Sequence, residues 1–187
     1  MKRLLLAFAT CLAATTFGCG ADPNAPATFV GDVEGTDVRV GVVTENGKVA
    51  MFFCGGPTSL DASTRWLRGA SPPSALDLTA QSWTAKGTAS GASASGTVDR
   101  GDGKALRWTA RRVGEDGLPG LYELVDAEGT AGVVVLDADH AQGAFIPKTG
   151  AVQQIEAIRP VRTNDTVEVR VVGAAPRTIV VRRVRAQ

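Results

Sequence analysis

The chain of 187 residues has a single histidine, only three cysteines and an aromatic content of 5%. An ordinary zinc site takes three or four nitrogen, sulfur or oxygen ligands, and one histidine without a pair of thiolates does not supply them. Neither a metal nor another cofactor is predicted. The charge is also nearly balanced, with 20 Lys and Arg against 19 Asp and Glu. Bulk electrostatics therefore gives no reason to expect a nucleic-acid partner.

Long apolar runs are lacking too, since no segment reaches the ~20 residues that a membrane-spanning helix needs. The most apolar stretch, Leu4–Ala14, follows the basic residues Lys2 and Arg3 and precedes small residues. A basic start, a short apolar run and a small-residue cleavage region are typical of a secretory signal peptide. Any membrane attachment is therefore expected to come from a lipid.

The Gly18-Cys19 pair that ends this region resembles the junction of bacterial lipoprotein signal peptides. The resemblance implies that residues 1–18 are removed and that Cys19 carries acyl chains such as palmitate. It further implies a lipid-anchored protein on the periplasmic or outer-membrane face of the cell envelope. The alternative is plain secretion after cleavage near Ala14 or Ala21, with Cys19 unmodified.

Residues 19–27 contain two prolines and are predicted to be an extended spacer between the anchor and the folded part. Residues 28–187 are predicted to form a single all-β domain, large enough for its own core. Cys54 would be the one cysteine in it, so burial of apolar surface must hold the domain together. Because Cys54 follows Phe52-Phe53, we expect it to be a small buried side chain.

Period-2 alternation of apolar and polar residues dominates this domain. The segments 38–42 and 49–53 both alternate, and Asn46-Gly47 between them suits the type I′ turn of a β-hairpin. Further strands are predicted at Ala75–Ala80, Ser82–Thr88, Ser93–Asp99, Leu106–Arg111, Leu121–Asp126, Gly132–Asp137 and Gly143–Ile146. Many short strands with tight connections favour an antiparallel meander that closes into a barrel-like sheet, with a two-layer β-sandwich as the alternative.

One short helix is predicted where this rhythm breaks, between Gly55 and Pro73. Ser59 or Asp61 would cap it, and Gly69 would end it. On this prediction the helix carries Leu60, Trp66 and Leu67.

Residues 152–187 are predicted to form a basic hairpin extension at the C-terminus. In it, Val167, Val169 and Val171 share one face, and the chain returns through Ile179 and Val181.

A weak internal repeat relates two parts of the sequence. Residues 34–36, 42–43 and 50–52 recur, with slightly different spacing, as 128–130, 134–135 and 144–145. Short self-similarity of this kind predicts a duplicated strand unit.

Several short segments resemble uncharacterised small secreted β-rich proteins of high-GC bacteria. The resemblance implies no particular activity. It rests on Val42–Gly56, Trp66 with Gly69, Gly120–Tyr122 and Val133–Leu136.

His140 is the only side chain on which a Ser/His/Asp hydrolase could be built. It sits in a polar turn near Asp137, and the Gly-x-Ser-x-Gly signature of such enzymes is absent. A secreted hydrolase that uses His140 or a pair of acids is therefore kept as the alternative, and an enzyme is not the expected outcome.

Binding residues are predicted mainly among the tryptophans and the C-terminal arginines. Trp66, Trp83 and Trp108 are expected first as core or rim aromatics, and second as a ligand platform that lines a barrel mouth. Arg182 and Arg183 are expected either as charges that keep edge strands from pairing with other chains or as contacts to an anionic or acidic partner. The sequence thus predicts a binding or structural module for a small ligand, an envelope polymer or a protein.

Overall fold

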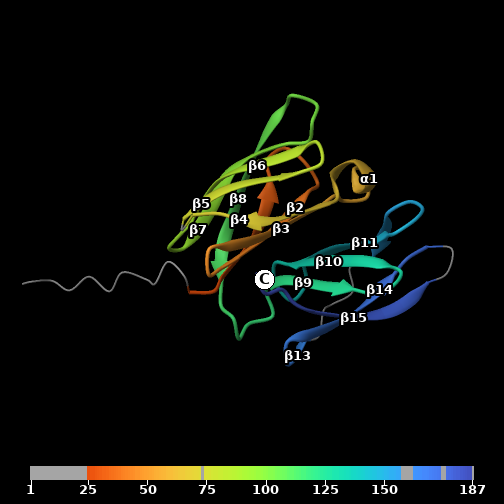
Figure 1. The fold of residues 1–187 in the computed structure, drawn as a ribbon. Helices are drawn as coiled ribbons and strands as arrows, with labels where there is room; N and C mark the ends of the chain where they lie inside the picture. Colours follow the sequence, from red (N-terminus) through yellow and green to blue (C-terminus); the bar gives the residue numbers. More distant parts are fainter. Residues whose placement is uncertain (1–24, 73, 157–161, 174–175, 187) are drawn as a thin grey trace, which may run out of the picture.

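The computed structural model describes residues 25–72, 74–156, 162–173 and 176–186. The predicted signal peptide, Cys19 and most of the spacer lie outside these residues. The described chain is almost entirely antiparallel β-structure in two sheets, which curl into two barrels packed against each other (Figure 1). This confirms the predicted all-β meander with barrel-like closure.

Barrel A is the eight-stranded sheet formed by the first half of the chain, in the order β4-β3-β2-β1-β8-β7-β6-β5. Its edge strands β4 and β5 face each other across a seam, where Arg65 donates a hydrogen bond to Gln81. The barrel is therefore nearly closed. Its strands are β1 (Ala27–Val33), β2 (Arg39–Glu45), β3 (Lys48–Cys54), β4 (Arg65–Ala70), β5 (Ala75–Ala80), β6 (Trp83–Ser90), β7 (Ser93–Asp99) and β8 (Ala105–Val113).

Barrel B contains the remaining strands, in the order β12-β11-β10-β9-β15-β14-β13. A pairing of β12 with β14, through Ile155 and Val171, closes the ring and leaves β13 outside it. The strands are β9 (Gly120–Val125), β10 (Gly129–Val135), β11 (Ala141–Pro147), β12 (Gln153–Ile155), β13 (Arg162–Thr163), β14 (Thr166–Val171) and β15 (Arg177–Arg183).

The predicted hairpins are confirmed. Asn46 and Gly47 have φ values of 52° and 73°, as a type I′ turn requires, and Glu45 pairs with Lys48 beside them. Near the C-terminus, Val167 pairs with Val181 in the β14–β15 hairpin.

The helix prediction was wrong in extent. The helix α1 covers only Leu60–Ser63, and Trp66 and Leu67 lie on strand β4 instead. Leu67 is fully buried in barrel A because it alternates with the outward-facing Trp66. Pairing with β3 thus overrides the local helix signal.

Three apolar clusters stabilise the fold. One fills barrel A and one fills barrel B, and the third forms a layer between the two barrels. The layer is possible because β2 and β3 carry apolar side chains on both faces. Met51 and Phe53 point into barrel A, whereas Phe52 and Cys54 point toward barrel B.

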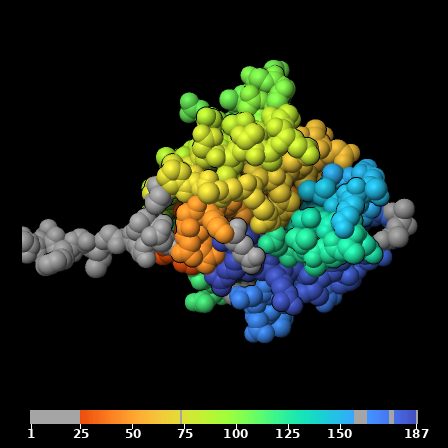
Figure 2. All heavy atoms as spheres, in the orientation of Figure 1, coloured from red at the N-terminus to blue at the C-terminus, as the bar shows by residue number. Residues whose placement is uncertain are grey.

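Two glycines allow the barrels to approach each other closely. A Cβ atom on Gly132 would lie 2.5 Å from the ring of Phe52, and one on Gly41 would lie 2.9 Å from Leu121. Gln142 of β11 adds polar bonds, because its Nε2 donates to the carbonyl oxygens of Asp37 at 2.9 Å and Cys54 at 2.5 Å. Figure 2 shows the two barrels as contiguous masses, barrel A in orange to green and barrel B in cyan to blue.

The predicted repeat relates the two meanders that form this layer. It matches the β1–β2 turn, β2 and β3 with the β9–β10 turn, β10 and β11. These are the strands whose outer faces pack together between the barrels. A duplicated origin stays a prediction.

Candidate functional site

Two of the three tryptophans lie inside barrel A. Trp108 is fully buried, and Trp83, 4% exposed, packs against Phe53 with 5.8 Å between the ring centroids. Both belong to the apolar core of the barrel. In this structure they fill the interior and do not line its mouth.

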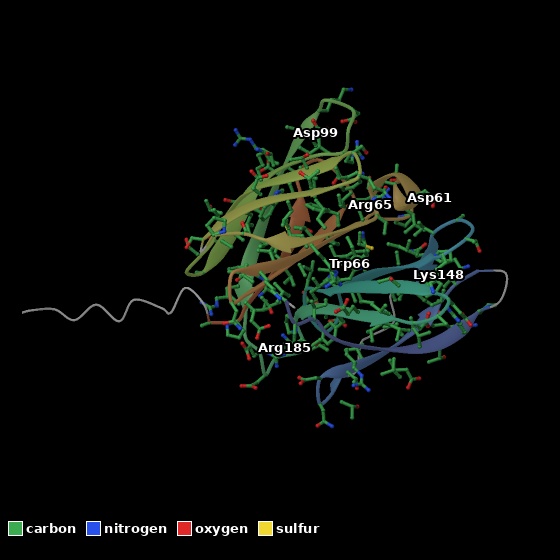
Figure 3. All side chains as sticks on the ribbon, viewed as in Figure 1. Asp61, Arg65, Trp66, Asp99, Lys148 and Arg185 are labelled. Atoms are coloured by element: carbon green, nitrogen blue, oxygen red, sulfur yellow. The ribbon has the colours of Figure 1, made fainter. Side chains whose placement is uncertain are left out.

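Trp66 lies on the outer face of β4, near the place where the barrels meet (Figure 3). Its ring centroid is 4.6 Å from that of Phe52, and the guanidinium carbon of Arg68 lies 4.3 Å from the same ring. Arg68 also forms an ion pair with Glu123 of barrel B. Trp66 therefore belongs to the contact between the barrels and is only partly exposed.

The two adjacent arginines of β15 have different environments. Arg182 is exposed, whereas Arg183 is 6% exposed. The Arg183 guanidinium donates to the carbonyl oxygens of Gly117 and Pro119 in the β8–β9 connection and to the hydroxyl of Tyr122 on β9. Arg183 thus holds that connection in place and is not available to an external partner.

The five predicted binding residues consequently occupy separate places. Trp83 and Trp108 lie in barrel A, Trp66 lies between the barrels, and Arg182 and Arg183 lie on barrel B. Cys54 is completely buried, as expected, and burial raises the pKa of its thiol to about 12.

His140 occupies the exposed β10–β11 turn. Its Nδ1 lies 2.7 Å from Oδ1 of Asp137, and the same carboxylate accepts the backbone N–H groups of Asp139 and His140. The N–H of Asp139 and the His140 ring hold the pKa of Asp137 below its usual value. No hydrogen bond joins His140 to a serine among the described residues.

In the part of the chain that the structure describes, no three His, Cys, Asp or Glu side chains are grouped as a metal site would need. Within the same residues, no helix is long and apolar enough to cross a membrane.

A large, open hollow lies on the outer face of β1, β7 and β8, against the β10–β11 turn of barrel B. Its volume is about 620 Å³. Arg111 spans it, with Nη2 donating to the carbonyl oxygen of Leu136 at 2.6 Å. The polar side chains that line this hollow are Asp32, Ser93, Ser95, Thr109, Arg111 and Asp137.

A second hollow of about 370 Å³ adjoins the first and shares Ser95 and Thr109 with it. It adds Thr97, Arg107 and Glu34. We call the two hollows together the outer groove. Arg107 makes no ion pair with any described residue, so its guanidinium donors remain available.

The register of β7 and β8 explains why hydroxyl groups and arginines line the outer groove. Ser93, Ser95 and Thr97 of β7 pair with Arg111, Thr109 and Arg107 of β8. All six side chains point outward, because the residues between them on β7 and β8, such as Ala94 and Ala110, point into barrel A. The result is two parallel rows of hydroxyl groups and arginines.

Sequence reasoning did not single out this surface. The signal was present in the alternation of Ser93, Ser95 and Thr97 with smaller or apolar residues. From this alternation alone only a strand at Ser93–Asp99 is predicted, because which strands lie side by side is not visible in the sequence.

No protein-family model matches the chain, and no curated protein or solved structure is significantly similar to it. The residues of the chain itself are therefore the basis for proposing a function.

Proposed function

We propose that this protein is a lipid-anchored binding module of the cell envelope, and that its outer groove binds a neutral, hydroxyl-rich polymer of the envelope. The observation that carries the proposal is the continuity of the groove, since the two hollows share Ser95 and Thr109. A continuous open groove suits an extended chain better than a compact ligand.

The groove offers both kinds of hydrogen-bonding partner. Arg107 and Arg111 supply donors, Glu34 and Asp137 supply acceptors, and the serine and threonine hydroxyls can do either. Sugar hydroxyls likewise donate and accept. Because the charges in the groove are of both signs, the arrangement favours a neutral glycan over a polyanion.

The anchoring half of the proposal rests on the sequence around Cys19. The described chain begins at Ala25, and β1 starts at Ala27. The six Cα-to-Cα steps from Cys19 to Ala25 span at most about 22 Å when fully extended. A lipid on Cys19 would therefore keep the groove close to the membrane and to the polymers beside it.

The test is calorimetric titration of the mature Cys19→Ser chain with soluble fragments of cell-wall glycan. The double variant Ser95→Ala/Thr109→Val removes two hydroxyls at the join of the hollows and preserves side-chain shape. We expect it to bind about thirtyfold more weakly, since each of the two lost neutral hydrogen bonds costs about 1 kcal/mol.

The matched control is Thr178→Val, which removes an exposed hydroxyl from the outer face of barrel B. It should leave the affinity unchanged. Equal affinity of the wild-type protein and the double variant would contradict the assignment of the groove. Intact mass of the native protein tests the anchor separately, because the proposal expects an acylated Cys19 at the N-terminus.

The competing function is hydrolysis through His140. The geometry favours binding, because the described contacts of the His140 side chain are with Asp137 alone in an exposed turn. His140→Ala should leave glycan binding unchanged, and a hydrolytic activity lost in a folded His140→Ala variant would favour the enzyme instead.

A further inference from the structure

A smaller and more enclosed cavity lies at one end of barrel A, beside the β2–β3 and β6–β7 turns. Its volume is about 120 Å³. We call it the mouth cavity. It lies inside the barrel, whereas the outer groove lies on the barrel's outer face, so an inference about the cavity is independent of the proposed function.

The floor of the mouth cavity is apolar. Phe29, Val49, Leu76 and Ala89 line it, and all four are at least nine-tenths buried in the core of barrel A. The barrel's opposite end is filled by Trp83 and its neighbours. An eight-stranded barrel has an interior that side chains can just fill or that can hold one small ligand.

The small side chain of Ala89 helps to leave this space. Ala89 of β6 pairs with Ala94 of β7, and both point into the barrel at the mouth end. A leucine at position 89 would extend into the cavity that Ala89 lines. A larger side chain at position 89 should therefore reduce the free volume of the cavity.

The rim of the cavity is polar and carries a net positive charge, because Lys48 and Arg112 accompany a single acid, Glu45. The Arg112 guanidinium lies beside the entrance, with Nη1 and Nη2 3.5 and 3.4 Å from the carbonyl oxygens of Gly91 and Pro26. Lys48 is exposed and forms no ion pair with any described residue. Its ammonium group is thus available to an anion at the entrance.

We infer that the mouth cavity binds a short linear aliphatic carboxylate. The alkyl chain lies against Phe29 and Leu76, and the carboxylate lies at the rim beside Lys48. The volume of about 120 Å³ is close to that of an engineered apolar cavity, about 150 Å³, that holds one benzene molecule. A chain of a few carbons therefore fits, and a long fatty acid does not.

The first experiment measures the dissociation constants of the mature Cys19→Ser chain for a series of linear carboxylates, from butanoate to decanoate. Each buried CH₂ contributes about 0.8 kcal/mol, which is about fourfold in affinity. We expect affinity to rise about fourfold per carbon for the shortest members and then to level off once the cavity is full. The 1-alkanol of the same length should bind about two- to fivefold more weakly than the carboxylate, as expected for loss of an ion pair with an exposed lysine.

Two variants test whether the carboxylates bind in the mouth cavity. Ala89→Leu should abolish the dependence on chain length, and its thermal unfolding shows whether the barrel still folds. Lys48→Gln changes an exposed side chain and should weaken every carboxylate by a similar factor, while the 1-alkanols are unaffected. Lys104→Gln, on an exposed loop outside the cavity lining, is the charge control.

The inference is overturned if affinity does not depend on chain length, or if a folded Ala89→Leu variant binds as the wild-type protein does. A rise in affinity that continues through decanoate would also overturn it, since a cavity of this size must fill earlier. Equal binding of carboxylates and alkanols would refute the role of Lys48.

Discussion

The interiors of barrels A and B are filled by different kinds of side chain. Barrel A has eight strands, and its interior is filled by large residues, among them Trp83, Trp108 and Met51. Barrel B closes with fewer strands, and its interior is filled mainly by valines, together with Tyr122 and Phe145. Because barrel diameter grows with strand number, the wider barrel needs bulkier side chains and retains a cavity where alanines replace them.

Each barrel also depends on the other to cover part of its outer apolar surface. Phe52 and Leu121 fill the layer between the barrels, each against a glycine of the opposite barrel. Apolar surface on the outside of one barrel is thus covered by the outside of the other. This arrangement implies that the barrels fold as one cooperative unit.

The largest expected effect follows truncation of a phenylalanine in this layer. Phe52→Ala should lower the free energy of unfolding by about 3–5 kcal/mol, because it leaves a cavity against Gly132. Urea unfolding can be followed by tryptophan fluorescence, which reports barrel A and, through Trp66, its contact with barrel B, and by far-UV circular dichroism, which reports both barrels. Phe53→Ala, which acts inside barrel A, is the matched comparison.

For the wild-type protein the two signals should give one coincident transition. Separate transitions would mean that the barrels are independent and that the apolar layer does not couple them.

The next effect concerns the adjacent arginines of β15. Arg183→Met should cost about 2–3 kcal/mol, because it leaves the half-buried carbonyl oxygens of the β8–β9 connection without their donor. Arg182→Met, at an exposed position, should change stability by less than about 0.5 kcal/mol. Thermal unfolding of both variants measures the difference, and similar effects at the two positions would contradict the role given to Arg183.

A smaller effect is expected from adding a methyl group between the barrels. Gly132→Ala places a Cβ atom within 2.5 Å of the Phe52 ring, and such overpacking costs about 1–3 kcal/mol. The shorter side chain in Gly132→Ala/Phe52→Leu should recover part of the loss. Gly114→Ala, where nothing lies within 4 Å, serves as the control.

The smallest effect is a change in acid sensitivity. Hydrogen bonds from Ser59 and Thr58 lower the pKa of Asp37 from 3.8 to about 2. A depressed pKa in the folded state means that the ionised group stabilises the fold above about pH 4 and that this contribution is lost as the pH falls toward 2. Asp37→Asn should therefore lose less stability than the wild-type protein between pH 4 and 2.

Chemical unfolding at several pH values measures this difference. Parallel curves for the wild-type protein and Asp37→Asn would contradict the contribution of the Asp37 carboxylate. At pH 6 the variant should be less stable by about 1 kcal/mol, since charge-assisted hydrogen bonds are lost.

Much of the fold could be predicted because its signals are local. Asn46-Gly47 fixes a hairpin by backbone conformation alone, and the alternation in β8 and β14 shows which side chains face inward. Trp66 was misplaced because Ser59 and Asp61 are good helix caps, and only the pairing of β4 with β3 decides against a longer helix.

The division into two barrels and the outer groove were not predictable in the same way. The apolar run through Phe52, Phe53 and Cys54 does indicate a strand buried on both faces, but not what covers its second face. The groove brings β7 and β8 together with the β10–β11 turn, so its lining depends on how the barrels pack.

The most direct test of the proposed function is a nuclear magnetic resonance titration of the isotope-labelled mature Cys19→Ser chain with soluble cell-wall glycan fragments. The account predicts that amide shifts concentrate at Ser93–Thr97, Arg107–Arg111 and the β10–β11 turn. The amides around Ala89 at the mouth of barrel A should remain unchanged. Shifts confined to other surfaces, or no shifts at millimolar glycan, would contradict the account.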